Sequence, residues 1–309
     1  MPIAEAKFIW HNGKLVAWRD ATVHVLAHAL HYGSTVFEGL RSYATPKGPV
    51  IFRLTDHTKR LFDSAKIYRI DIPFTLEQIN AACKQVITAN NLTKGAYLRP
   101  FAFRGYGEIG VAPKTWPPTE TVVAAFEWGA YLGADGLENG IDACVSSWQR
   151  LAPNTIPTLG KAAGNYLSSQ LISMEAKRLG FAEGIGLSTD GTVSEGAGEN
   201  LFLVRGGVIY TPAVDNSILQ GITRDTVIQL ARARGLEVRE QSLPRELLYL
   251  ADEIFLTGTA AEVTPVRSVD RITIGAGKRG PITEAIQSAF FGLFTGATPD
   301  QHGWLEDCN

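Results

Sequence analysis

The alternation of hydrophobic and polar residues in the first part of the chain predicts both strands and helices. Two short apolar runs flank Asn12-Gly13, the dipeptide best suited to the two positive φ angles of a tight turn, so we expect a β-hairpin there. The run PVIFRL at 49–54 predicts a strand. Apolar residues then recur at helical spacing, which predicts a helix over 55–70 with Thr55 as its cap.

Similar patterns continue on both sides of a glycine-rich stretch. We expect a helix at 76–91, strands at 96–105, 120–128, 141–148 and 182–188, a hairpin over 200–212 turning at Gly206-Gly207, and helices near 164–179, 223–234 and 281–294. The glycines of WGAYLGADGLENG predict a linker at 131–138 between a first domain at 1–130 and a second at 139–309. With no repeat or low-complexity tract, the chain is expected to form an α+β fold of two domains.

Composition and charge are typical of an ordinary globular protein. The 309 residues are 45% hydrophobic and 19% charged, and the formal net charge of -2 gives no electrostatic reason to expect nucleic acid or a membrane as partner. Three widely spaced cysteines indicate neither a disulfide framework nor a zinc site. The first residues lack the apolar core of a signal peptide, and no run of about 18 apolar residues occurs. We therefore expect a soluble, cytoplasmic protein.

One lysine stands among small residues in TLGKAAGNY at 158–166. Lys161 is the only charged residue of this stretch, and its neighbours leave room around the amine. By itself the stretch is also typical of a solvated loop, because lysine side chains are rarely buried. The rest of the chain has to decide between a loop lysine and a reactive amine.

Three other segments combine glycine with groups that bind anions or protons. Glu195 and Glu199 surround a glycine turn before an apolar strand, and either a solvated turn or a functional carboxylate fits this pattern. LQGITRDTV at 219–227 begins a helix, whose free N–H groups and dipole suit a phosphate. LTGTAAEVTP at 256–265 follows a strand and again presents small residues. Together with Lys161 these features suit pyridoxal 5'-phosphate, which needs a lysine for its Schiff base and a carboxylate at its ring nitrogen.

The chain resembles the bacterial branched-chain amino acid aminotransferases, within the fold type IV, class IV pyridoxal-phosphate-dependent aminotransferases, over nearly its whole length. The resemblance rests on HALHYGSTVFEGLRSY, HTKRLFDSAKIYR, AYLRP, GYGEIGV, PNTIPTLGKAAGNYLSS, SEGAGENLF, LQGITRD and TGTAAEVTPV, in this order. It implies a smaller N-terminal domain, a larger C-terminal domain whose barrel-like β core carries the lysine, and an active site at the domain and subunit interface. It also implies at least a homodimer, with hexamers (trimers of dimers) as the higher assembly.

The resemblance implies transamination between leucine, isoleucine or valine and 2-oxoglutarate. Lys161 would form the covalent link to pyridoxal 5'-phosphate and then carry the proton between the substrate Cα and the C4' carbon. Glu195 would pair with the pyridine nitrogen. Tyr166 would hydrogen-bond the ring hydroxyl, although a tyrosine near a helix start is otherwise typical of a core.

The cofactor phosphate would have several ligands according to the same resemblance. These are Arg60, the N–H groups of Ile222 and Thr223, and Thr259. The alternative for Arg60 is a helix-surface ion pair with Asp56 or Asp63.

The substrate pocket would have to accept both an apolar side chain and glutamate. The N–H groups of Thr259 and Ala260, helped by Tyr97, would hold the α-carboxylate, and Arg99 would meet the γ-carboxylate of glutamate at the rim. The resemblance assigns to the apolar walls Phe37, Trp128, Tyr131 and Tyr166, with Tyr32 and Val111 supplied by the partner subunit. Each such aromatic residue alone would be typical of a core. Glu127 departs from the apolar pattern beside the pocket and leaves the side-chain preference open.

Other functions remain possible from the residues alone. His24, His28 and His31 share one face if their segment is helical, which would suit a metal-dependent hydrolase, but no carboxylate in the segment completes the set. Within the same fold, a D-amino acid aminotransferase or an aminodeoxychorismate lyase is the nearer alternative, and YLRP and GYGEIGV favour the branched-chain enzymes. A binding module without catalysis would not need both Lys161 and Glu195.

Overall fold

The computed structural model describes residues 3–128 and 134–308, and the chain forms two compact units. Unit 1 comprises Met1–Trp128, Gly160–Gly164 and Pro299–Asn309, and unit 2 comprises Gly129–Leu159 and Asn165–Thr298. The expected linker at 131–138 lies partly outside the described residues, and its second part forms helix α4 (Ala134–Asn139). Each unit is described by itself.

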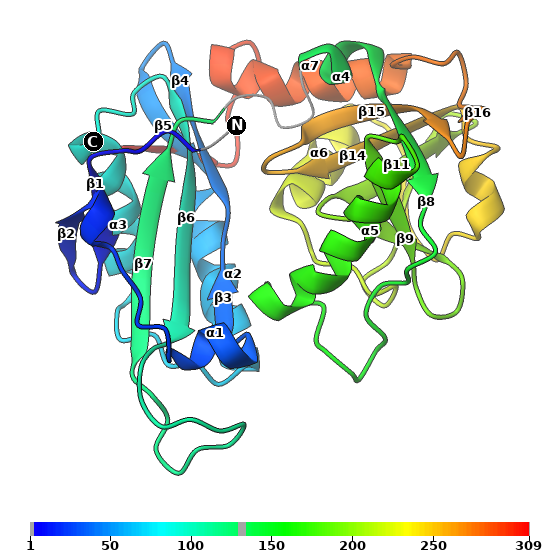
Figure 1. Cartoon of the computed structure of the whole chain (residues 1–309). Helices are drawn as coiled ribbons and strands as arrows, with labels where there is room; N and C mark the ends of the chain where they lie inside the picture. Colours follow the sequence, from blue (N-terminus) through cyan, green and yellow to red (C-terminus); the bar gives the residue numbers. More distant parts are fainter. Residues whose placement is uncertain (1–2, 129–133, 309) are drawn as a thin grey trace. The chain divides into compact units, whose positions relative to one another are not determined.

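Unit 1 is built on an antiparallel sheet with the strand order β17-β5-β4-β6-β7-β1-β2, and β3 pairs with β6 (Figure 1). The strands are β1 (Phe8–His11), β2 (Lys14–Ala17), β3 (Thr35–Phe37), β4 (Leu40–Thr45), β5 (Gly48–Phe52), β6 (Gly95–Arg104), β7 (Thr119–Phe126) and β17 (Leu305–Asp307). Helices α2 (Leu54–Ile67) and α3 (Leu76–Ala89) pack against each other and against the sheet. Their buried apolar faces and the sheet form one core, because hydrophobic side chains recur on one side of each helix.

The hairpin and the long helices of unit 1 confirm the sequence pattern, with one correction. Asn12 and Gly13 have φ values of 48° and 91°, as a tight turn requires. Helix α2, however, begins at Leu54, and Thr55 is not its cap. The backbone N–H and the hydroxyl of Thr55 instead donate to the Glu306 carboxylate at 2.7 and 2.9 Å. An acidic group from a distant strand therefore satisfies this helix N-terminus.

Unit 2 contains a mixed sheet with the strand order β10-β9-β8-β15-β14-β11-β12-β13, and β16 pairs with β15 (Figure 1). The strands are β8 (Ile141–Val145), β9 (Glu183–Leu187), β10 (Val193–Gly196), β11 (Asn200–Arg205), β12 (Val208–Thr211), β13 (Val238–Glu240), β14 (Glu253–Gly258), β15 (Glu262–Val269) and β16 (Ile272–Thr273). The neighbours β8 and β9, β8 and β15, and β12 and β13 are parallel. The hairpin of β11 and β12 turns at Gly206-Gly207, as predicted.

Three long helices cover parts of this second sheet. Helix α5 (Tyr166–Arg178) packs on β9, whereas α6 (Ile222–Arg232) and α7 (Pro281–Thr295) pack on β14 and on each other. All three confirm the predicted helices to within two residues at each end. Short helical segments complete the structure, and they are η1 (Trp18–Asp20), α1 (His28–Tyr32), η2 (Ala163–Asn165) and η3 (Arg245–Leu248). Within the described residues no helix is long and apolar enough to cross a membrane.

Candidate active site

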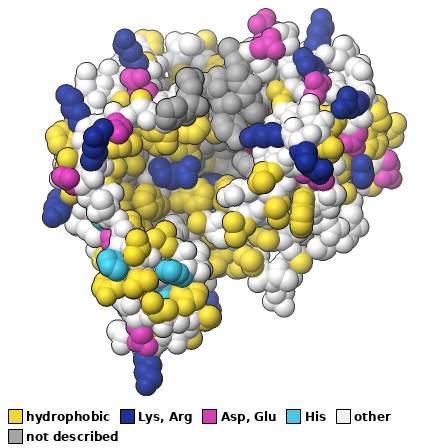
Figure 2. Space-filling model, viewed as in Figure 1, with side chains coloured by type: hydrophobic (Ala, Val, Ile, Leu, Met, Phe, Trp, Pro, Cys, Tyr) yellow, Lys and Arg dark blue, Asp and Glu magenta, His cyan; other side chains and the backbone are white. Residues whose placement is uncertain are grey.

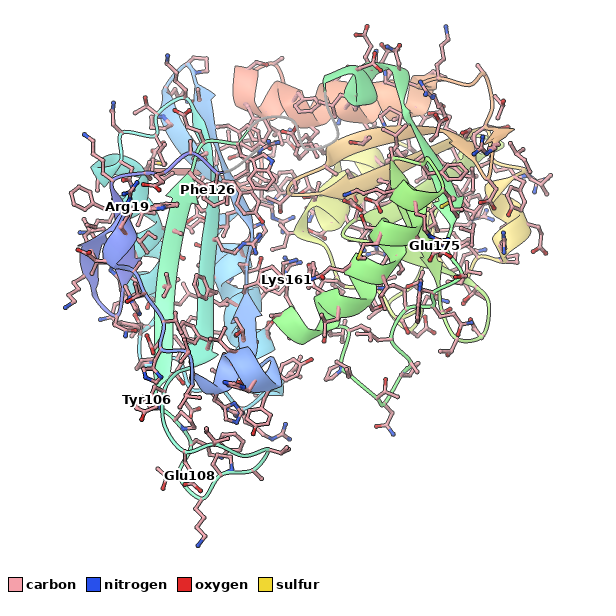
Figure 3. The ribbon with its side chains drawn as sticks, in the orientation of Figure 1. Arg19, Tyr106, Glu108, Phe126, Lys161 and Glu175 are labelled. Carbon is pink, nitrogen blue, oxygen red and sulfur yellow. The ribbon has the colours of Figure 1, made fainter. Side chains whose placement is uncertain are left out.

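Lys161 is fixed through its backbone to strand β3 and helix α2 of unit 1. The N–H of Phe37 donates to the Lys161 carbonyl at 3.0 Å, and the N–H of Lys161 donates to the Ser64 hydroxyl at 2.9 Å. Its Nζ atom lies 5.0 Å from the centre of the Phe37 ring (Lys161 is labelled in Figure 3). A Cβ atom on the preceding Gly160 would lie 2.8 Å from the Tyr68 ring, so this approach requires glycine. Lys161 was expected in the second domain, but its backbone packs with unit 1.

A buried charged cluster joins Glu38 to two residues of helix α2, His57 and Arg60, and Arg60 lies four residues before Ser64. Glu38 is fully buried and accepts from Arg60 Nε at 2.6 Å and from Arg60 Nη2 at 2.9 Å. Its Oε2 atom also lies 2.7 Å from Nδ1 of His57. The sequence left open an ion pair of Arg60 with Asp56 or Asp63 on its own helix; the structure gives Arg60 the buried partner Glu38, and Asp56 accepts from Arg53 Nε at 2.7 Å. Arg60 is thus oriented by a buried carboxylate that sequence spacing did not indicate.

Burial acts on both acidic and basic groups of this cluster. Burial alone would raise the pKa of Glu38, but the charge of Arg60 and the hydrogen bonds from Arg60 and His57 outweigh it and hold that pKa far below its ordinary value. Burial lowers the pKa of His57, against the opposing effect of Glu38. Near neutral pH a neutral His57 therefore holds Glu38 by a hydrogen bond, while Arg60 supplies the positive charge.

Arg99 and several aromatic rings form a second group in unit 1. Arg99 Nη2 donates to the Tyr97 hydroxyl at 2.9 Å, and the guanidinium carbon lies 4.6 Å from the centre of the Phe37 ring. The Tyr97 ring contacts Phe126 and Trp128 at centroid distances of 5.6 and 5.1 Å (Phe126 is labelled in Figure 3). Among the described residues the Arg99 Nε is buried with no hydrogen-bond partner. A buried cationic donor without an acceptor is the feature expected of a site for an anionic ligand.

Glu195 is the centre of a polar network in unit 2. Arg150 Nη2 donates to its Oε1 atom at 2.6 Å, while Asn200 Nδ2 and the N–H of Leu219 donate to Oε2 at 3.0 and 3.1 Å. Arg150 is itself held by the Ser169 hydroxyl at 3.0 Å. The network fixes a buried, ionised carboxylate at the end of strand β10. Sequence reasoning missed Arg150, Asn200 and Leu219, because they approach Glu195 only through the fold.

Glu199, the second acidic residue of this motif, forms hydrogen bonds within the glycine turn. Its carboxylate accepts from the N–H of Gly198 at 3.0 Å, and its carbonyl accepts from the N–H of Gly196 at 2.7 Å. These contacts close the glycine turn between β10 and β11. Of the two acidic residues singled out in this motif, Glu195 has the environment of a functional group and Glu199 shapes the turn.

The predicted phosphate residues of unit 2 lie in two turns. Ile222 and Thr223 begin helix α6, and no side chain caps the helix at Gly221. A Cβ atom on Gly221 would lie 2.0 Å from Oδ1 of Asn200, so a side chain here would displace the network around Glu195. Thr259 lies in the turn between β14 and β15. Because the first N–H groups of a helix point along its axis, the start of α6 is suited to receive an anion.

The remaining predicted pocket residues are distributed as follows. Tyr166 begins helix α5 and Trp128 follows β7, and both are half-buried; Ala260 lies in the turn after β14; Tyr131 lies outside the described residues. Glu127, whose direction the sequence left open, is exposed. Tyr32 and Val111 are also exposed.

The three histidines do not converge on one point. His28 is buried between the Ser34 hydroxyl and the Gly110 carbonyl, the His24 ring contacts the Tyr106 ring at a tilt, and His31 forms a hydrogen bond with the Val25 carbonyl. In the described part of the chain no group of three His, Cys, Asp or Glu side chains could hold a metal ion. His24 and His31 instead lie in an exposed apolar surface that we call the α1 surface, defined by Val25, Leu30, Tyr32, Tyr106, Ile109 and Val111. Figure 2 shows histidine and hydrophobic side chains gathered over this end of unit 1.

Comparison with known proteins agrees with these features. The family model "Amino-transferase class IV" matches residues 35–269. The branched-chain-amino-acid aminotransferase of Escherichia coli K12 is 58% identical over the full length of both chains, and that of Pseudomonas aeruginosa is 47% identical over 96% of this chain and 95% of its own. The crystal structure of the Escherichia coli enzyme superposes with a TM-score of 0.97 at 58% identity, covering 99% of this chain and all of its own. The crystal structure of the Thermobaculum terrenum enzyme in its PLP-form gives 0.91 at 35% identity, covering 99% of each.

The chain therefore belongs to the class IV aminotransferases, which depend on pyridoxal 5'-phosphate, and within them to the family of branched-chain amino acid aminotransferases. The expected family and fold type are confirmed, and these relatives do not favour the D-amino acid aminotransferase or lyase alternative. The residues fit the cofactor. Lys161 is held among small residues, Glu195 is a buried carboxylate, and helix α6 begins without a side-chain cap.

Proposed function

We propose that this protein transfers the amino group between branched-chain L-amino acids (leucine, isoleucine and valine) and 2-oxoglutarate. The observation that carries the proposal is that the Phe37 ring lies next to the Arg99 guanidinium, whose buried Nε has no hydrogen-bond partner among the described residues. One group suits an aliphatic side chain, and the other suits the second carboxylate of glutamate. In support, solved relatives at 46% and 44% identity are complexes with N-(5'-phosphopyridoxyl)-L-glutamate and with 4-methylvaleric acid.

The cofactor, when bound, supplies an aldehyde that links to amines and a ring that accepts electrons. We assign the covalent link to Lys161, whose amine also moves the proton at the substrate Cα. Glu195, kept ionised by the donors around it, holds the proton on the pyridine nitrogen. Tyr166 donates to the ring hydroxyl.

The phosphate and the α-carboxylate are assigned to backbone and cationic donors. Arg60 and the N–H groups of Ile222 and Thr223 bind the phosphate, together with Thr259. The N–H groups of Thr259 and Ala260, helped by Tyr97, bind the substrate α-carboxylate. These donors orient the substrate before proton transfer, and orientation alone supplies much of the rate enhancement in such reactions.

The pocket discriminates between substrates by the two groups described in unit 1. Phe37, Trp128 and Tyr166, with Tyr131, contact the aliphatic side chain of leucine, isoleucine or valine. Arg99 pairs with the γ-carboxylate of glutamate through its otherwise unpartnered Nε. Because one site must accept both, we place the charged contact at the rim and the aromatic contacts deeper in the pocket.

We further propose a homodimer at least, with a trimer of dimers as the larger assembly, in the cytoplasm. The α1 surface exposes large apolar side chains, including Tyr32 and Val111, which would complete the neighbouring site in a dimer. A cluster of exposed large apolar side chains is typical of an interaction surface rather than of a monomer exterior. Cys83, Cys144 and Cys308 are all buried and unbridged, which suits a reducing compartment.

The proposal is tested by the visible spectrum of the purified protein and by Lys161→Ala. The wild type should absorb as a bound cofactor and change on addition of L-leucine but not of D-alanine. Lys161→Ala should lose transamination because both the covalent link and the proton carrier are absent. Lys177→Ala, at an exposed lysine, is the control and should retain activity. Substantial activity of Lys161→Ala would remove this lysine from the mechanism.

Glu195→Gln tests the role of Glu195 at the pyridine nitrogen of the cofactor. It retains a similar shape but removes the anion, so the chemical step should slow by about 10²-fold or more, as for other groups that stabilise developing charge. The rate is measured by rapid mixing of the loaded enzyme with L-leucine, under conditions where cofactor occupancy is shown to be complete. Wild-type kinetics at full occupancy would refute the role of Glu195.

A further inference from the structure

Glu38 and His57 have no part in the chemistry proposed above, yet they are among the most buried polar groups of unit 1. Both are nearly inaccessible to solvent, at 0% and 2% exposure. Glu38 follows β3 directly, and its N–H donates to the Pro100 carbonyl at 2.8 Å. Burying a carboxylate costs free energy unless specific partners compensate it. Its partners here are His57 and Arg60, which lie three residues apart on one face of α2.

We propose that Glu38 and His57 are positioning residues that orient the Arg60 guanidinium for the cofactor phosphate. The inference rests on the proposed role of Arg60 as a phosphate ligand. The Glu38 carboxylate accepts two hydrogen bonds, from Nε and Nη2 of Arg60, at 2.6 and 2.9 Å. Because the guanidinium is planar and carries five donors, gripping one edge fixes the direction of all the others.

His57 fixes the carboxylate in turn. Its Nδ1 atom lies 2.7 Å from Glu38 Oε2, the same oxygen that accepts from Arg60 Nη2. The buried, neutral ring adds a hydrogen bond without a second positive charge. A flexible arginine would lose rotamer entropy on binding phosphate, and the chain Arg60, Glu38, His57 removes that loss in advance.

Whether Glu38→Gln tightens or weakens phosphate binding distinguishes a positioning role from a simple effect of charge. Glu38 is an anion beside a proposed anion site, so by electrostatics alone Glu38→Gln should tighten the binding of phosphate. If Glu38 acts by orienting Arg60, the same change should weaken phosphate binding, because glutamine has one acceptor oxygen in place of two and its NH2 group would face a guanidinium N–H donor. Positioning and charge therefore predict opposite results.

The experiment compares two ligands of the apoprotein that differ in the phosphate group alone. Pyridoxal 5'-phosphate and pyridoxal are titrated separately, and each dissociation constant is measured from the visible absorption of the bound ligand. For Glu38→Gln we expect the constant for pyridoxal 5'-phosphate to rise about tenfold to a hundredfold, as for loss of a hydrogen bond to a charged group. The constant for pyridoxal should change by less than about threefold, because pyridoxal lacks the phosphate that Arg60 is proposed to bind.

Three further variants keep the result interpretable. Glu306→Gln removes a carboxylate that bonds Thr55 at the start of the same helix without touching Arg60, and it should leave the ratio of the two constants unchanged. His57→Leu removes the donor to Glu38 and should reduce the preference for the phosphorylated ligand. His57→Asn can restore an N–H near the position of Nδ1, and it should recover most of that preference. If Glu38→Gln does not fold, this histidine pair decides the question.

Arg60→Gln distinguishes the failure of this inference from that of the proposed function. If Arg60→Gln leaves the preference for the phosphorylated ligand intact, the phosphate assignment itself is wrong. If Arg60→Gln abolishes the preference but Glu38→Gln does not reduce it, or tightens binding, the positioning role alone is overturned. Equal losses for both ligands would likewise overturn it, because they would indicate a general structural defect.

Discussion

The ion pair between Arg150 and Glu195 allows the effect of burial to be separated from the effect of distance. Arg150 Nη2 and Glu195 Oε1 are 2.6 Å apart, with side chains 7% and 6% exposed. Arg239 Nε and Glu237 Oε1 are also 2.6 Å apart, with side chains 50% and 56% exposed. Breaking a buried pair by removing one partner costs about 3–5 kcal/mol, whereas an exposed pair contributes about 0–1 kcal/mol.

We therefore predict that Arg150→Met strongly destabilises the apoprotein and that Arg239→Met does not. Asn200 and the Leu219 N–H still donate to Glu195 in Arg150→Met, so we expect the lower end of the range, about 3 kcal/mol. For a domain of 150–250 residues about 1 kcal/mol corresponds to roughly 2–4 °C, so the Tm should fall by about 6–12 °C. The fall for Arg239→Met should stay below about 4 °C.

The assay is calorimetry of the cofactor-free variants at a single scan rate, because bound cofactor would itself raise the Tm. The double variant of Arg150→Met with Glu195→Gln removes both charges and should recover most of the loss. The reasoning is refuted if Arg150→Met and Arg239→Met have equal effects. It is also refuted if the double variant is as unstable as Arg150→Met, since the unpaired charge would then not be the cause.

Three other outcomes follow from the groups in unit 1. For Arg99→Leu the rate of the half-reaction with L-leucine should stay within about tenfold of wild type, whereas glutamate should lose roughly 2–5 kcal/mol of binding free energy. Both half-reactions are followed by single-turnover mixing, and equal losses would contradict dual recognition. In Gly39→Ala the new Cβ would lie 2.0 Å from the Tyr97 hydroxyl, so that ring must move away from Arg99, and the KM for 2-oxoglutarate should rise about tenfold; an unchanged KM would show that the contact is dispensable. Burial would raise the pKa of Glu38, but Arg60 and His57 lower it below its value in the unfolded chain. The ionised Glu38 therefore stabilises the fold above the ordinary glutamate pKa, and this stabilisation is lost as the pH falls below about 4. The Tm difference between wild type and Glu38→Gln, measured against pH, should shrink in that acidic range, and a difference that grows there would contradict the assignment.

Local sequence signals predicted the parts of the structure that local forces determine. The turn at Asn12-Gly13 and the helix that begins at Leu76 follow from backbone preferences and periodicity over a few residues. Lys161 and Glu195 were recognisable because charged groups among glycines are unusual and because the surrounding segments resemble a known family. Their roles in catalysis remain predictions.

The partners of those residues could not be predicted, because they depend on the tertiary fold. Arg150 lies 45 positions from Glu195, and Arg60 lies 22 positions from Glu38. Spacing along helix α2 suggested an acidic partner on the same helix for Arg60, but the fold supplies one from the end of strand β3. The cap of α2 was missed for the same reason, since Glu306 is 251 positions from Thr55.

The bond between Thr55 and Glu306 also determines the order in which the protein can be completed during synthesis. Strand β17 pairs with β5, and Glu306 closes the start of α2, yet residues 305–307 leave the ribosome only after all of unit 2 has been made. Domains commonly fold as they emerge, with the N-terminal one first. Unit 1 is synthesised first but cannot complete its sheet until strand β17 has been made, whereas all of unit 2 precedes β17 in the chain. A chain that is released from the ribosome without residues 305–309 would therefore contain a folded second unit and a first unit whose sheet lacks the edge strand β17.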